Sequence, residues 1–217
     1  MVSAPVPVRA VLLDWDGTLI NSYHADARAY VQMFRALEIG WTLQDLARHY
    51  SPNWYSVYRA AQIPRAQWKR ADFLWRRAYR YQDAALYPGT RRALATLARR
   101  YQIGLVTGGG RGRVQRQLTA FDLARVFSVR IFSESTKHKK PHPAPLLLAM
   151  RRLGLDCKEC VYVGDAPQDI EMARNARVFS VAVTGTSPVP ARLKASRPDA
   201  QIDSIVELPA LLRTLKR

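Results

Sequence analysis

Short apolar runs alternate with longer amphipathic segments over much of this chain, and this alternation is the main clue to its fold. The first run covers residues 8–13, has the length of a buried strand, and ends at Asp14. The same signal predicts later strands at 103–106, 129–132, 160–163 and 178–183. Helical spacing predicts helices at 90–100, 112–120, 143–153 and 168–176. Strands and helices in alternation predict an α/β fold, a doubly wound parallel sheet with helices on both faces.

The segment between residues 23 and 85 has a different character, because strand-like runs vanish from it. Tyr30, Phe34 and Leu37 sit at helical spacing, and prolines divide the segment into about four helices. Four of the five tryptophans lie here, at positions 41, 54, 68 and 75. We therefore expect an all-helical unit with its own core, inserted after the first strand. The expected boundaries are 1–20 and 87–217 for the α/β core and 21–86 for the insert.

Polar residues that directly follow the apolar runs are the first candidates for chemistry, because ligands of open α/β sheets bind beyond the carboxyl ends of the strands. Asp14 and Asp16 leave the first strand two residues apart. Such a pair can converge on one cation, or it can belong to a solvated turn. Thr107 and Gly108 begin a Thr-Gly-Gly-Gly stretch after the second strand. A hydroxyl and backbone N–H groups before a helix suit an anionic oxygen, although a flexible turn has the same composition.

Two further sites lie in the second half of the chain. Lys140 belongs to a basic cluster that leads into a helix, where it could neutralise a phosphate together with a carboxylate. The alternative is a solvated basic loop. Asp165 leaves the strand at 160–163, and Asp169 follows four residues later near the start of a helix. These two acids could complete a site for a hard cation, or they could cap the helix.

The four sites together resemble the haloacid dehalogenase-like hydrolase superfamily over nearly the whole chain. The segment Val11-Leu-Leu-Asp-Trp-Asp-Gly-Thr-Leu19 looks like the first motif of that superfamily. Leu105-Val-Thr107, Lys140-Pro-His-Pro143 and the segment 161–176 look like the second, third and fourth. A helical insert after the first motif is similar to the phosphoglycolate phosphatase-like branch. The resemblance implies a Rossmann-like core with a helical cap.

The resemblance also implies a mechanism, in which Asp14 is the nucleophile that forms an aspartyl-phosphate and Asp16 is the general acid and base. A Mg²⁺ ion would be held by Asp14, the backbone carbonyl of Asp16, Asp165 and Asp169, an all-oxygen ligand set. The phosphoryl oxygens would be held by Thr107, Gly108 and Lys140. Arg177 departs from the pattern, since the branch has glycine there, and the turn is expected to be strained.

The insert is expected to act as a cap that closes over the site and excludes water. Its segment 50–54 is the candidate for choosing the substrate, with Tyr50, Asn53 or Trp54 contacting the leaving group. Tyr50 and Trp54 could instead be core residues of the cap.

Charge raises a different possibility. The chain of 217 residues has 34 Lys and Arg against 17 Asp and Glu, a net charge of +17. A balance this basic suggests nucleic acid, a membrane surface or an anionic substrate as partner. The excess is scattered, since the insert carries 10 basic against 5 acidic residues and no basic run is longer than Lys137–Lys140. This distribution fits a compositional bias or a solvated surface better than a nucleic-acid stripe, and the charge could still steer an anionic substrate to the protein.

Apolar runs, the N-terminal segment and the cysteines indicate where in the cell the protein works. No apolar run approaches the ~20 residues of a membrane span, and neither a secretory signal nor a disulfide framework is evident. We therefore expect a cytoplasmic enzyme without a membrane partner. The expected function is Mg²⁺-dependent hydrolysis of a small phosphomonoester such as phosphoglycolate. Two alternatives stay open, a phosphosugar mutase of the same superfamily and a nucleic-acid-binding protein on an inactive hydrolase fold. The sequence leaves the oligomeric state open.

Overall fold

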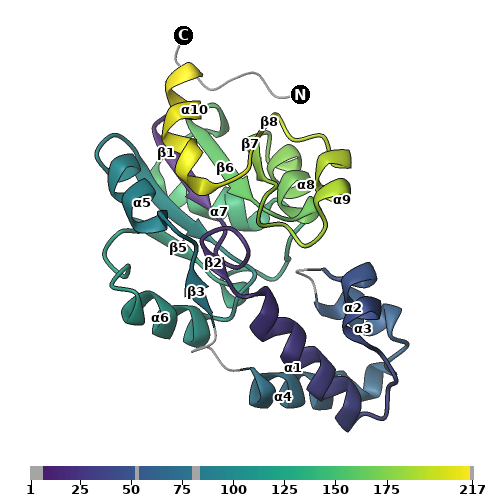
Figure 1. The fold of residues 1–217 in the computed structure, drawn as a ribbon. Helices are drawn as coiled ribbons and strands as arrows, with labels where there is room; N and C mark the ends of the chain where they lie inside the picture. The colour runs from purple at the N-terminus through teal and green to yellow at the C-terminus, as the bar shows by residue number, and fades with distance from the viewer. Residues whose placement is uncertain (1–6, 52–53, 80–83, 216–217) are drawn as a thin grey trace.

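A parallel sheet of six strands forms the centre of the protein (Figure 1). The computed structural model describes residues 7–51, 54–79 and 84–215. The strands are β1 (Ala10–Leu13), β4 (Gln102–Val106), β5 (Val129–Ile131), β6 (Cys160–Gly164), β7 (Phe179–Val183) and β8 (Ala200–Ile202). Their order is β5-β4-β1-β6-β7-β8, and every pairing is parallel. The predicted α/β class is confirmed, and the chain changes direction across the sheet at β1, between β4 and β6.

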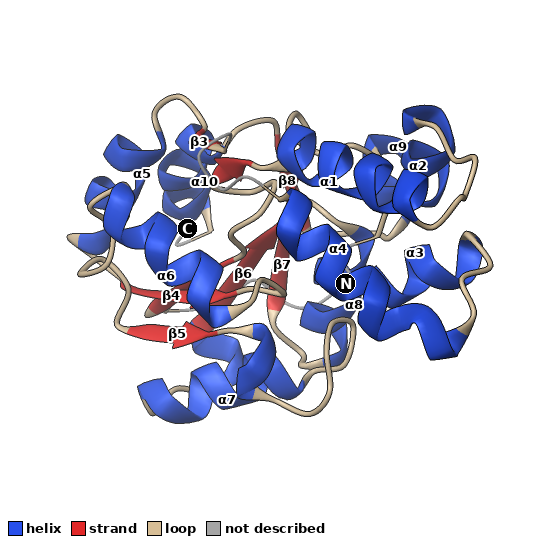
Figure 2. Ribbon diagram, turned by 90° about the horizontal axis from the view of Figure 1, so that it is seen from below, coloured by secondary structure: helices blue, strands red, loops and turns tan. Residues whose placement is uncertain are grey.

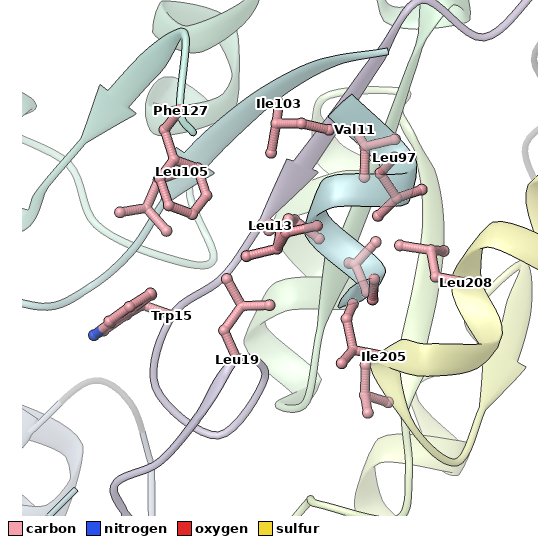
Figure 3. Close-up of a cluster of buried hydrophobic side chains, with 14 of the residues drawn as sticks. Val11, Leu13, Trp15, Leu19, Leu97, Ile103, Leu105, Phe127, Ile205 and Leu208 are labelled. Atoms are coloured by element: carbon pink, nitrogen blue, oxygen red, sulfur yellow. The ribbon is translucent and has the colours of Figure 1, made fainter. Parts of the chain in front are cut away.

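Helices cover both faces of the sheet, and Figure 2 shows α6 and α7 on opposite sides of it. The helices of the core are α5 (Thr90–Ala98), α6 (Arg111–Ala120), α7 (Ala144–Leu153), α8 (Pro167–Asn175), α9 (Pro190–Ala195) and α10 (Leu208–Thr214). Successive side chains of a strand point to opposite faces. Val11 and Leu13 therefore pack with α5, α6 and α10 (Figure 3), whereas Ala10 and Leu12 pack with α7 and α8. This double burial explains why β1 has no polar position.

Four α-helices form a separate unit beside the sheet (Figure 1). They are α1 (Tyr23–Ala36), α2 (Leu43–His49), α3 (Trp54–Ala60) and α4 (Trp68–Ala78). Their core contains Met33, Phe34 and Tyr58, and all four tryptophans of the unit pack against it. Two short antiparallel strands, β2 (Ile20–Asn21) and β3 (Ala85–Leu86), pair where the chain enters and leaves the unit. This helical unit, residues 23–78, has the number of helices that the sequence predicts.

The sequence did not predict several short elements of the structure. The strands β2, β3 and β8 have only two or three residues each, and β8 lies at the edge of the sheet. Short 3₁₀ turns lie at 65–67, 133–135, 157–159 and 205–207. Arg177 has a φ of 58°, the left-handed conformation that the missing glycine would have adopted without strain. None of the described helices is long and apolar enough to cross a membrane.

Candidate active site

The carboxyl ends of β1, β4 and β6 bring the polar candidates to one edge of the sheet. Asp14 follows β1, Thr107 follows β4, and Asp165 follows β6, and these three strands are neighbours. Lys140 reaches the same place from the loop before α7, and its side chain is buried. The change of chain direction at β1 leaves a crevice at this edge, as expected for an open α/β sheet.

Three buried carboxylates and one buried ammonium form the centre of this site. Carboxylate oxygens of Asp14, Asp165 and Asp169 all lie within 4.8 Å of one another. The Nζ atom of Lys140 lies 2.8 Å from Oδ1 of Asp14 and 2.7 Å from Oδ1 of Asp169. Burial raises the pKa of Asp14 to about 7 despite the nearby Lys140, and burial together with Asp169 raises the pKa of Asp165 well above its usual value. One ammonium does not balance three carboxylates, so the cluster has the charge and the oxygen donors that suit Mg²⁺.

Asp169 caps α8 and also belongs to the buried charge cluster, while its predicted role toward a metal stays a prediction. Its Oδ2 atom accepts a hydrogen bond of 3.1 Å from the backbone N–H of Ala166, as a residue capping the start of α8 would. Its Oδ1 atom faces both Lys140 and the hydroxyl of Tyr162, at 2.7 and 3.0 Å. A Cβ atom at Gly164 would lie 2.4 Å from Cγ of Asp169. Glycine at 164 therefore allows the helix to bring this carboxylate against the end of β6.

Glycine is equally necessary in the turn after β1. Gly17 has a φ of +77°, and a Cβ there would lie 2.1 Å from Oδ2 of Asp165. The hydroxyl of Thr18 donates to Oδ1 of Asp165 at 2.9 Å. The turn that follows Asp14 and Asp16 therefore packs directly on the carboxylate that follows β6.

The loop after β4 has the features of an anion-binding turn. The backbone N–H of Gly109 donates to Oγ1 of Thr107 at 2.9 Å, which leaves the hydroxyl hydrogen of Thr107 to donate to a ligand. A Cβ at Gly109 would lie 2.6 Å from Arg113 and 3.2 Å from Oδ2 of Asp16. Because this position has no side chain, α6 can approach the turn after β1. Gly108 lines the same cavity as Thr107 and Asp14.

Arg113 is the main feature of the site that the sequence reading missed. Its Nη2 and Nη1 atoms donate to Oδ2 and Oδ1 of Asp16 at 2.6 and 2.8 Å, a two-pronged ion pair. Nη1 also lies 3.2 Å from Oε1 of Gln117, which in turn accepts a hydrogen bond from the indole N–H of Trp15. Burial opposes ionisation of Asp16, but the charge and hydrogen bonds of Arg113 outweigh it and lower the pKa of this carboxyl. The carboxylate of Asp16 thus points to α6 and not into the three-carboxylate cluster. Its predicted backbone role toward a metal stays a prediction.

A cavity of about 440 Å³ connects this site to the helical unit. Tyr50 and Trp54 line it and also pack against the core of the unit, as one of the two interpretations expects. Their contact with a leaving group stays a prediction. The hydroxyl of Tyr50 donates to Oδ2 of Asp26 at 2.7 Å, and Asp26 also lines the cavity. Asn53 lies outside the described residues. Asp26 was not a candidate in the sequence, where an acid in the first turn of a helix has an ordinary explanation.

Comparison with known proteins agrees with this geometry. Residues 11–183 match the sequence family described as haloacid dehalogenase-like hydrolase. The phosphoglycolate phosphatase of Escherichia coli is 32% identical over 94% of this chain and 92% of its own length. The phosphoglycolate phosphatase of Yersinia pseudotuberculosis is 30% identical over 94% and 93%.

Solved structures extend the likeness to the fold. A hydrolase from Pseudomonas syringae superposes with a TM-score of 0.85 at 22% identity, over 96% of this chain and 100% of that one. A haloacid dehalogenase-like family hydrolase from Streptococcus pneumoniae superposes with a TM-score of 0.82 at 20% identity, over 94% and 98%. At these identities the two structures support a shared fold and carry no argument about function.

Proposed function

Because this chain belongs to the haloacid dehalogenase-like hydrolase family, we propose that it cleaves a small phosphomonoester in a Mg²⁺-dependent reaction through an aspartyl-phosphate on Asp14. Its likeness to phosphoglycolate phosphatases over 94% of its length makes it a phosphoric monoester hydrolase. One observation carries the finer proposal. Buried Asp14 lies among two further carboxylates, Asp165 and Asp169, contacts the ammonium of Lys140, and shares a cavity with Thr107.

The first step transfers the phosphoryl group to the protein. An oxygen of Asp14 attacks phosphorus and the bond to the ester oxygen breaks. The protonated form of Asp16, released from its ion pair with Arg113, gives its proton to the leaving alkoxide. Lys140, the hydroxyl of Thr107 and the N–H of Gly108 hold the phosphoryl oxygens. Asp14, Asp165 and Asp169 would hold Mg²⁺, which when bound would supply positive charge beside the phosphate.

The second step frees the protein. Asp16, now a carboxylate, takes a proton from water, the water oxygen attacks phosphorus, and the bond to Asp14 breaks to release inorganic phosphate. We propose that the helical unit closes over the site during this cycle and excludes bulk water. On this proposal residues 21–86 are a cap on a core of residues 1–20 and 87–217.

A panel of phosphomonoesters, assayed for released phosphate with Mg²⁺ and with EDTA, tests the proposed function. We expect several small esters to be hydrolysed with Mg²⁺ and none with EDTA. Isomerisation of a sugar phosphate without released phosphate would instead identify a mutase. Salt-sensitive retention of DNA, without hydrolysis of any ester, would identify a nucleic-acid-binding protein and overturn the proposal.

The ion pair between Arg113 and Asp16 leads to a prediction about pH. For Arg113→Met we expect the alkaline limb of the kcat/KM profile to move up by about one pH unit. The reason is that Arg113 lowers the pKa of Asp16, so its removal keeps the acid protonated to higher pH. The measurement is kcat/KM against pH for an alkyl phosphate, whose leaving group needs a proton.

Two comparisons make the pH prediction specific. Arg113→Lys keeps a positive charge and should shift the limb less than Arg113→Met. With p-nitrophenyl phosphate, the leaving group needs little protonation. For this substrate, kcat/KM of both variants should change little with pH over the range of the alkaline limb. An unchanged limb in Arg113→Met would show that Arg113 does not set the protonation of Asp16.

A further inference from the structure

The wall of the cavity that the helical unit contributes is acidic and aromatic. Asp26 on α1 and Asp72 on α4 line it, together with Tyr23, Tyr30, Trp75 and Tyr79. A leaving group attached to a phosphate on Asp14 would extend toward this wall, because the cavity runs from Asp14 to these residues. The chemistry of the wall therefore bears on which phosphomonoester fits.

Asp26 is placed to accept a further hydrogen bond. Its Oδ2 atom accepts from the hydroxyl of Tyr50 at 2.7 Å, and its Oδ1 atom accepts from the indole N–H of Trp75 at 2.9 Å. Both donors are neutral, and a carboxylate has about four acceptor positions. The cation beside it, Arg113, directs both ends of its guanidinium to Asp16. The two aromatic donors fix the orientation of Asp26 without neutralising its charge.

Aromatic rings add to the preference for positive charge. Tyr23 and Tyr50 meet edge to face with ring centroids 5.0 Å apart, and the centroids of Tyr30 and Trp75 lie 6.2 Å apart. The faces of such rings are electron-rich and attract ammonium groups. A wall that combines these rings with the carboxylate of Asp26 suits a positively charged nitrogen.

The same wall disfavours a carboxylate on the leaving group. A carboxylate near Asp26 would lie beside a like charge in a partly enclosed cavity, where repulsion is poorly screened. Arg76 and Arg116 also line the cavity, but both side chains are exposed. As exposed cations they would attract the phosphate dianion of any ester.

We propose that Asp26 and the rings around it bind a positively charged nitrogen of the leaving group, so that the substrate is the phosphomonoester of an amino alcohol rather than of a hydroxy acid. This inference rests on the proposed phosphatase function and names the substrate class for the same site. It differs from the substrate named for the Escherichia coli and Yersinia relatives.

Three esters with two-carbon leaving groups test the inference, because those leaving groups carry a positive, a zero and a negative charge. They are phosphoethanolamine, ethyl phosphate and phosphoglycolate, which end in an ammonium, a methyl and a carboxylate. We expect kcat/KM with Mg²⁺ to fall in that order, with at least a tenfold gap between the first and the last. Raising the salt from 0.05 to 1 M should narrow the gap, since the preference is electrostatic.

A charge-removing variant then assigns the preference to one residue. Asp26→Asn should bring the ratio of kcat/KM for phosphoethanolamine over ethyl phosphate close to one. Glu38→Gln is the matched control, since it removes the same charge from an exposed position on the helical unit, and it should leave the ratio unchanged. If Asp26→Asn does not fold, the order of the three esters and its salt dependence in the unmodified protein still decide the question.

The outcomes separate this inference from the proposed function. If phosphoglycolate is the best of the three esters, or if Asp26→Asn folds and keeps the preference for ammonium, the inference is wrong. The proposed function still stands in that case, provided p-nitrophenyl phosphate is hydrolysed with Mg²⁺. If no ester, including p-nitrophenyl phosphate, is hydrolysed with Mg²⁺, both proposals fail.

Discussion

Asp14→Asn is expected to lower the Mg²⁺-dependent kcat by roughly 10⁴-fold or more, the scale seen when a nucleophile is removed. An amide is a far weaker nucleophile than a carboxylate, and it removes one of the three negative charges that suit the metal. The measurement is single-turnover and steady-state release of phosphate from an ester that the unmodified protein cleaves. A residual rate near the original would exclude an aspartyl-phosphate at this position.

The variant must fold for this result to bear on mechanism, and the structure indicates that it does. Asparagine has nearly the shape of aspartate, and Lys140 keeps its contact with Asp169 at 2.7 Å. Burial also raises the pKa of Asp14 to about 7, which means that the ionised carboxylate lowers the stability of the folded state. Circular dichroism and thermal unfolding of the variant should match the unmodified protein closely.

Lys140→Met is expected to lower the free energy of unfolding by about 3–5 kcal/mol, in addition to abolishing activity. Lys140 is 5% exposed and contacts both Asp14 and Asp169, so its loss leaves three buried carboxylates without their ammonium. Methionine keeps the length of the side chain and removes the charge. The measurement is urea unfolding at neutral pH without added metal.

Two further measurements make this result specific to the buried cluster. Mg²⁺ should restore part of the stability lost in Lys140→Met, because the cation binds the folded state and replaces the missing charge. Lys137→Met, at an exposed position of the same basic run, should change the stability by less than about 0.5 kcal/mol. A loss below about 1 kcal/mol in Lys140→Met would mean that the cluster does not depend on this ammonium.

The sequence predicted the parts of the molecule whose signals are local. Buried parallel strands are continuous apolar runs, so β1 and β6 could be found, and the residues that follow them are aligned by the sheet itself. That rule placed Asp14, Thr107 and Asp165 together without any knowledge of their contacts. Short strands give a weak signal: β2, β3 and β8 were missed, whereas β5, also of three residues, was predicted.

The contacts that the sequence did not predict are long-range pairs between elements. Arg113 and Asp16 are 97 positions apart, and nothing distinguishes Arg113 from the other arginines of a chain that has 27 of them. Asp26 and Trp75 are 49 positions apart, on two helices whose packing depends on the whole helical unit. Such pairs can be identified only from the tertiary structure, because the packing of the elements determines which of many similar side chains come into contact.

The pairing of β2 with β3 has a consequence for how this protein could be rebuilt. Ile20 pairs with Leu86 and Asn21 with Ala85, so the chain leaves the α/β core and returns to it at adjacent positions. The residues between these two strands therefore form one long connection between neighbouring positions of the core, and the pairing of β2 with β3 already holds its two ends together. Exchanging that connection for a longer, shorter or foreign one would cost little closure entropy, which grows only slowly with length. We therefore expect that the helical unit can be exchanged while Asp14 and its partners stay in place, which would change the leaving-group pocket proposed above.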